Sequence, residues 1–153
     1  MVQVGLDIVA LHRDPQMDKR LLSGKFRVNR ELNEEWIDIQ NNGPYVLNMQ
    51  GRLLACMERI GLRSAPRGFR CLRKALIRAQ TTIPLDPGHK IRIYTGEQPA
   101  TSTQLGGQDR ISRVLWMVQA SYLWLSEGHE VHIYFSQDDL KQGKEPLSRF
   151  VYR

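Results

Sequence analysis

The chain has 153 residues, of which 41% are hydrophobic and 25% are charged, as in an ordinary folded domain. This composition excludes wholesale disorder, and no apolar run approaches the roughly 20 residues that span a bilayer. The formal net charge of +6 allows contact with nucleic acid, anionic lipid or an acidic protein surface. The N-terminus lacks the basic region of a signal peptide and reaches Asp7 early, so we expect a cytoplasmic protein without a membrane span.

The sequence contains two cysteines, Cys56 and Cys71. Their spacing fits neither a zinc knuckle nor a redox pair, so we expect buried free thiols. A disulfide between them is the alternative, and it requires an oxidising compartment.

Alternating apolar and polar residues predict strands from the start of the chain. Residues 2–11 follow this pattern, and so do residues 34–41, where Ile37 and Ile39 share a face. Asn, Gly and Pro at residues 42–44 predict a turn. Further extended segments are expected at residues 25–28, 45–49, 52–57, 129–135 and 147–152, with a charged turn or loop at residues 138–145.

The unit at residues 82–96 carries the strongest strand-and-turn signal. Pro87 presets one backbone angle of a turn at residues 86–88, and Gly88 accepts a positive φ. Apolar residues alternate on both sides of this turn, which predicts half-buried strands. We expect a core that includes Ile8, Ile37, Ile39, Leu53, Leu85, Ile91, Ile93, Val131, Ile133 and Phe150.

The segment at residues 58–80 is strongly basic. Between residues 52 and 78 the chain has eight Lys or Arg residues against one acid, Glu58. The segment reads either as a loop or as containing one short basic amphipathic helix. The helical alternative rests on the spacing of Leu72, Ala75, Leu76 and Ala79.

Residues 111–125 fit both a helical face and a strand, and periodicity alone does not separate the two. Short strand signals divided by Gly and Pro turns predict an all-β sandwich or barrel. No repeat or linker divides the sequence, so we expect a single domain over residues 1–153.

Three motifs follow one another in order: NEEWIDIQNNG at residues 33–43, IPLDPGHKIRIYTG at residues 83–96 and WLSEGHEVHIYFSQ at residues 124–137. Together they resemble the lamin tail domain, which occurs in nuclear lamins and in bacterial proteins, and the chain looks like a bacterial-type member. The matching residues are Glu35, Trp36, Asn41, Gly43, Leu85, Pro87, Gly88, Ile91, Ile93, Thr95, Gly96, Trp124, Gly128, Val131 and Tyr134.

The resemblance covers residues 2–152 and implies an immunoglobulin-like antiparallel β-sandwich, with residues 116–120 as a strand. In lamins this domain is associated with DNA, chromatin and membrane-protein partners. In bacteria it often accompanies secreted or membrane-associated hydrolases whose catalysis sits in other domains. The resemblance therefore implies a structural or scaffolding module rather than an enzyme.

The sequence offers no catalytic constellation and no motif for a cofactor or metal. His129 and His132 lie three residues apart on an expected strand, so their side chains point to opposite faces and do not share a metal. We expect two separate, half-exposed histidines. Trp36, Trp116 and Trp124 either stack on bases or sugars or, as is more common in a β-sandwich, fill the core or brace an edge.

Two functional hypotheses follow. In the first, the domain binds an unknown protein partner through sheet edges and loops, and an unpaired edge also permits a homodimer. In the second, the Arg-rich segment at residues 59–78 binds nucleic acid or another polyanion without sequence preference. The residues for this phosphate or acidic-partner contact are Arg63, Arg67, Arg70, Arg73, Lys74 and Arg78.

Overall fold

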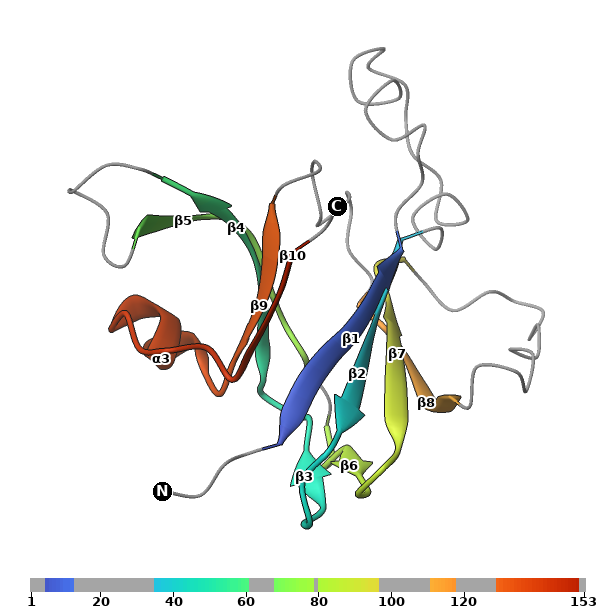
Figure 1. The fold of residues 1–153 in the computed structure, drawn as a ribbon. Helices are drawn as coiled ribbons and strands as arrows, with labels where there is room; N and C mark the ends of the chain where they lie inside the picture. The colour runs from blue at the N-terminus through green and yellow to red at the C-terminus, as the bar shows by residue number, and fades with distance from the viewer. Residues whose placement is uncertain are drawn as a thin grey trace.

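The computed structural model describes residues 5–12, 35–60, 68–78, 80–96, 111–117 and 129–151. The expected extended segment at residues 25–28 lies outside these ranges, and so do residues 118–125 of the segment that fits a helix or a strand. Within them the protein is all-β, with two four-stranded sheets, a small two-stranded sheet and one short helix (Figure 1).

The two large sheets have the strand orders β1-β2-β7-β8 and β10-β9-β4-β5, and β3 pairs with β6 in the small sheet. The first sheet contains β1 (Leu6–His12), β2 (Trp36–Asn41), β7 (Lys90–Tyr94) and β8 (Ile111–Trp116). The second contains β10 (Ser148–Val151), β9 (Glu130–Tyr134), β4 (Leu53–Arg59) and β5 (Phe69–Leu76). The remaining elements are β3 (Leu47–Asn48), β6 (Pro84–Leu85) and α3 (Gln137–Lys141).

The expectation of a purely antiparallel body is wrong at one strand pair. β7 and β8 run parallel, with Ile93 opposite Leu115 and Tyr94 opposite Trp116. A parallel pair requires a crossover connection, and the chain between the two strands is too long for a tight hairpin. Residues 111–125 fit both a helix and a strand by sequence, and the structure shows that residues 111–116 form a strand.

One hydrophobic cluster joins the two large sheets. Ile37, Ile39 and Ile91 come from the first sheet, and Val131 and Ile133 come from the second. The expected core is confirmed at nine positions, and Phe150 is partly buried against the same cluster. Burial of each large apolar side chain contributes roughly 1.5–3 kcal/mol before its ordering cost.

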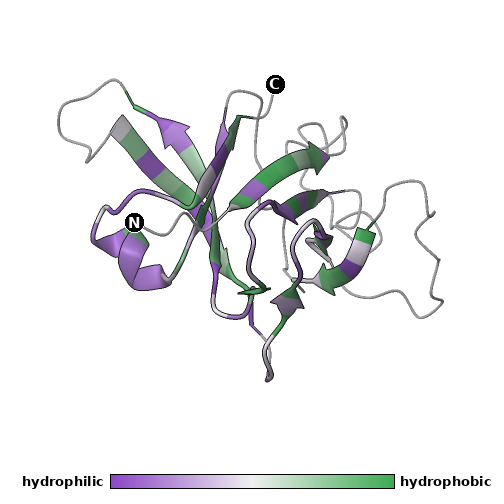
Figure 2. Ribbon diagram, turned by 60° about the horizontal axis from the view of Figure 1, so that its bottom comes forward, coloured by the Kyte–Doolittle hydropathy of each residue, from purple (hydrophilic) through white to green (hydrophobic). Residues whose placement is uncertain are grey.

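The central strands of the second sheet are buried on both faces. Leu54 and Cys56 of β4 join the core between the sheets, whereas Leu53, Ala55 and Met57 form a second cluster on the opposite face. Helix α3 lies on the side of this sheet that faces away from the first sheet (Figure 1). It contributes Leu140 to the second cluster, although most of the helix is hydrophilic (Figure 2).

The turn at Pro87 and Gly88 forms as predicted. Gly88 has a φ of 82°, and the N–H of His89 donates to the carbonyl oxygen of Asp86 at 3.0 Å. Pro at the second position and a positive φ at the third are the features of a type II turn. The turn leads from β6 of the small sheet into β7 of the first large sheet.

Residues of the first two motifs have structural roles. Buried Asn41 donates from its side-chain amide to the carbonyls of Tyr45 at 2.7 Å and Leu85 at 2.8 Å, which ties the turn after β2 to β6. The hydroxyl of Thr95 donates to the carboxylate of Glu35 at 2.6 Å, and both side chains are buried. Buried polar side chains in proteins almost always form hydrogen bonds. These contacts therefore explain why Asn41, Glu35 and Thr95 can be polar at buried positions.

The structure corrects two local expectations. The basic segment forms strand β5 rather than a helix or a loop over Phe69–Leu76. The expected turn at residues 138–145 begins instead inside α3, whose first turn is capped by Ser136. The side-chain oxygen of Ser136 accepts from the N–H of Asp139, and the acids of the first turn favour the N-terminal end of the helix.

Candidate functional site

Four of the six predicted binding residues can be placed. Arg70, Arg73 and Lys74 lie on β5, and Arg78 follows two residues after that strand. The other two, Arg63 and Arg67, are outside the described residues. Because β5 is the terminal strand of its sheet in the described part of the chain, the placed residues follow a sheet edge.

The basic side chains of β5 do not converge on one face. Arg73 lies opposite Cys56, which belongs to the core between the sheets, whereas Lys74 lies opposite Ala55, which faces the other way. Arg70 lies opposite Glu58 and forms an ion pair with it. The strand therefore presents its charge along an edge rather than as a flat basic surface.

A groove of about 470 Å³ lies between β5 and β8, the terminal strands of the two large sheets among the described residues. Lys74 and Arg78 supply its cationic groups, and apolar residues from the end of β5 and from β8 supply the rest. Its lining consists of Lys74, Ala75, Leu76, Ile77, Arg78, Leu115, Trp116 and Met117. The groove therefore combines positive charge, apolar surface and two strand edges.

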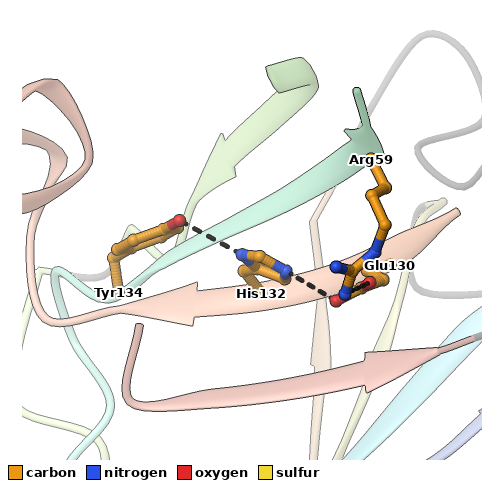
Figure 3. A network of polar contacts seen from close by, with 4 residues as sticks. All are labelled: Arg59, Glu130, His132 and Tyr134. Carbon is orange, nitrogen blue, oxygen red and sulfur yellow. Dashed lines mark hydrogen bonds and ion pairs between the residues drawn. The ribbon is translucent and has the colours of Figure 1, made fainter. Parts of the chain in front are cut away.

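A second feature is a polar network of Arg59, Glu130, His132 and Tyr134 (Figure 3). Its β9 residues alternate with Val131 and Ile133 of the core between the sheets, so they lie on the face that points away from the first sheet. Nε2 of His132 lies 3.1 Å from Oε1 of Glu130, and Nδ1 lies 3.2 Å from the hydroxyl of Tyr134. The other oxygen of Glu130 pairs with Nη2 of Arg59 at 3.1 Å. The side chains of β9 in this network are at most 5% exposed, whereas that of Arg59 is 69% exposed.

The network sets the tautomer that His132 adopts when its imidazole is neutral. A carboxylate only accepts, so the proton lies on Nε2 and Nδ1 accepts from the hydroxyl of Tyr134. Desolvation by burial lowers the pKa of His132, and the Glu130 carboxylate opposes this shift while Arg149 and Arg59 add to it. His132 is therefore a neutral, oriented imidazole at neutral pH.

The expectation of two half-exposed histidines is wrong for His132, which is 1% exposed. Residues 130, 132 and 134 alternate in period two, so the sequence places Glu, His and Tyr on one strand face. This alternation is the feature of the sequence from which the network could be predicted. The burial comes from distant parts of the chain, because Phe69 of β5 contacts the imidazole edge-on at 4.8 Å between ring centroids.

A cavity of about 380 Å³ lies beside this network. Apolar side chains from β4, β5, α3 and the segment before β10 line it together with His132 and Tyr134. The full lining is Met57, Phe69, Cys71, His132, Tyr134, Leu140, Gly143, Lys144, Glu145, Pro146 and Arg149. Neither Cys56, in the core, nor Cys71, at an exposed position, forms a disulfide, and the expectation that both thiols are buried is wrong for Cys71. Desolvation raises the pKa of the Cys71 thiol, which makes it a poor nucleophile at neutral pH.

The aromatic residues of the first sheet form a row across its four strands. His12 lies opposite Trp36, Trp36 opposite Tyr94, and Tyr94 opposite Trp116. The rings of His12 and Trp36 are stacked at 5.3 Å between centroids, and those of Tyr94 and Trp116 at 6.0 Å. These rings stack on one another, so they brace the sheet as cross-strand pairs.

No helix among the described residues is both long and apolar enough to cross a membrane. No protein-family model matches the chain, and no curated protein matches it.

Proposed function

We propose that this protein is a non-enzymatic binding module that holds an extended acidic polypeptide in the groove between β5 and β8. The proposal includes an immunoglobulin-like arrangement of the two sheets and membership of the lamin tail domains, as the sequence motifs imply. It also includes a cytoplasmic location, where the thiols of Cys56 and Cys71 stay reduced.

The observation that carries the proposal is the juxtaposition of two terminal strands with cationic and apolar groups between them. Terminal strands bind extended peptides by adding a strand, and pockets beside the edge select alternate side chains of the peptide. Lys74 and Arg78 favour acidic side chains at such positions, while Ile77, Leu115 and Met117 favour apolar ones. An occupant with alternating acidic and apolar residues fits both requirements.

A second copy of the chain fits this edge less well than an acidic partner. Strand-to-strand pairing of β5 with itself would bring Arg73 and Lys74 close to basic residues of the other copy. Like charges directly opposite one another destabilise a strand pair. A homodimer through β5 is therefore the less favourable use of the edge.

Nucleic acid also fits less well. Binding to a phosphate backbone is strongest when cations gather on one surface, whereas Arg73 and Lys74 lie on opposite faces of β5. Arg70 is already paired with Glu58. Charged side chains on a terminal strand can also serve only to prevent aggregation. Peptide binding that depends on Lys74 and Arg78 distinguishes a binding role from this protective role.

The test measures fluorescence polarisation of three labelled ten-residue peptides in which apolar residues alternate with Glu, Gln or Lys. We expect the Glu peptide to bind, and a proline at its centre to abolish binding because strand addition requires main-chain hydrogen bonds. The double variant Lys74→Gln/Arg78→Gln should lower affinity roughly tenfold, which is about 1.4 kcal/mol.

The control double variant Lys90→Gln/Lys141→Gln removes the same charge outside the groove lining and should bind like the native protein. Equal binding of the Glu and Gln peptides, or no binding of either, would overturn the proposal. Tighter binding of a single-stranded oligonucleotide, with a steep loss of affinity on adding salt, would replace it with the nucleic-acid hypothesis.

A further inference from the structure

The cavity on the outward face of the second sheet, beside the network of Figure 3, is separate from the groove between β5 and β8. We propose that this cavity is a binding site for a small organic anion with a flat apolar body, of the aromatic carboxylate class. The inference is independent of the peptide-binding proposal, because the two sites share no lining residue.

The size and walls of the cavity suit such a ligand. Its volume of about 380 Å³ lies within the range of small-molecule sites, roughly 300–1,000 Å³. Met57, Phe69, Leu140 and Pro146 provide apolar walls from four different parts of the chain. An apolar ring that enters this space is removed from water, and this favours binding in proportion to the apolar surface that the ring buries.

The charges around the cavity favour an anion. Arg149 and Lys144 line it as cations, and Glu145 is its single acidic lining residue among the described ones. Lys144 also lies 3.6 Å from a carboxylate oxygen of Asp139, so Arg149 is the main candidate for pairing with a ligand. The guanidinium of Arg149 lies 5.9 Å from the centroid of the Phe69 ring, which places the cationic group close to an apolar wall. That arrangement matches a carboxylate attached to a ring.

The polar wall of the cavity is already ordered. His132 is held at one ring nitrogen by Glu130 and at the other by Tyr134, and Glu130 is held by Arg59. The negative charge of Glu130 is thus engaged by partners within the network and does not stand open against an entering anion. A preorganised wall lowers the ordering cost of binding.

The experiment uses three probes of similar size and different charge: benzoate, benzamide and benzylamine. Each is titrated at millimolar concentration into the full chain, and binding is followed by two-dimensional NMR. We expect benzoate to bind more tightly than benzamide, benzylamine to bind least, and the largest shifts to occur at Phe69, Cys71, His132 and Arg149.

The variant Arg149→Gln should weaken benzoate binding about tenfold and leave benzamide binding unchanged. The control variant Arg70→Gln, on the same sheet but outside the cavity lining, should change neither. Arg149 is exposed, so its substitution leaves the folded core intact. Equal affinity for the three probes, shifts that map elsewhere, or a benzoate affinity unaffected by Arg149→Gln would overturn the assignment.

Discussion

The guanidinium of Arg92 holds the carboxylate of Asp38 through two hydrogen bonds, 2.8 Å at Nε and 2.9 Å at Nη2. The two residues lie directly opposite each other on β7 and β2, and each side chain is at most 7% exposed. The guanidinium also lies 3.7 Å from the centroid of the Trp36 ring. The hydrogen bond to Asp38 raises the pKa of Arg92, so its charge is retained inside the protein.

Removing one member of this pair should destabilise the fold strongly, because the other charge stays buried without its partner. We expect Asp38→Leu to lower the free energy of unfolding by about 3–5 kcal/mol. The double variant Asp38→Leu/Arg92→Met should recover much of that loss, since it buries no unpaired charge. Denaturant unfolding measures both, with Asp7→Ala, at an exposed position of β1, as the control. A double variant no more stable than the single one would contradict this account.

Alanine substitutions at Gly5 and Gly51 distinguish the cost of a steric clash from the cost of backbone strain. Both have positive φ, 67° and 82°, but a Cβ on Gly5 would lie 2.5 Å from Cα of Gly43, whereas a Cβ on Gly51 would meet nothing within 4 Å. Gly51→Ala should therefore cost only the left-handed strain, about 1–2 kcal/mol. Gly5→Ala should cost roughly 1–3 kcal/mol more, because the chain must shift to relieve the clash. Equal melting temperatures of the two variants would exclude this contact as a packing constraint.

The hydrogen bond between Thr95 and Glu35 gives Thr95, a residue of the second motif, a structural role that can be tested. Thr95→Val keeps the shape of the side chain but removes the donor to a buried carboxylate, so we expect a loss of about 1–3 kcal/mol of stability. Thr82→Val makes the same change at an exposed position and should alter stability by less than about 0.5 kcal/mol. Chemical denaturation of the two variants side by side measures the difference, and equal losses would refute the role given to this bond.

His132 should make stability depend on pH. Burial lowers its pKa in the folded protein, whereas in the unfolded chain the pKa is about 6.5, so the unfolded chain binds more protons as the pH falls. The contribution is fully present above about pH 6.5 and is lost as the pH falls from there through the lower folded-state pKa.

The measurement compares the free energy of unfolding of the native protein and of His132→Gln between neutral and mildly acidic pH. We expect the difference between them to change in that window, because only the native protein titrates at this position. Parallel curves for the native protein and His132→Gln would show that the imidazole does not resist protonation.

The sequence predicts the strands well where period two is unbroken. Ile37 with Ile39 and Ile91 with Ile93 alternate regularly, and each of these four residues lies in the core. The turn at Gly88 is equally predictable, because a positive φ after Pro restricts the choice of residue strongly.

The sequence pattern does not predict strand β5, because the pairing register of β5 with β4 is interrupted. Cys56 pairs with Arg73 and Met57 with Cys71, so Leu72 is an extra residue in the strand. The irregularity lets Leu72 pack against the same core as Ala75, although residues three apart on a regular strand face opposite ways. A spacing of three also fits a helix, which is why this segment resembled one.

The candidate sites were only partly predictable. The position of Lys74 and Arg78 at a groove depends on β8, whose pairing with β7 is parallel and non-local. The burial of His132 likewise depends on Phe69, more than sixty residues earlier in the chain. The helix α3 did carry a local signal, since Ser136 is followed by Asp139 in the spacing of a helix cap.

The N–H of Ile8 donates to the hydroxyl of Ser148 at 3.0 Å, so neighbouring strands of the two large sheets meet across 140 positions of sequence. During synthesis on the ribosome, β1 emerges long before β10, and this seam closes only after the last strand has left the exit tunnel. Contacts of such long range slow folding, because the entropy of loop closure is lost before they form. Until β10 is available, the N–H of Ile8 lacks this acceptor.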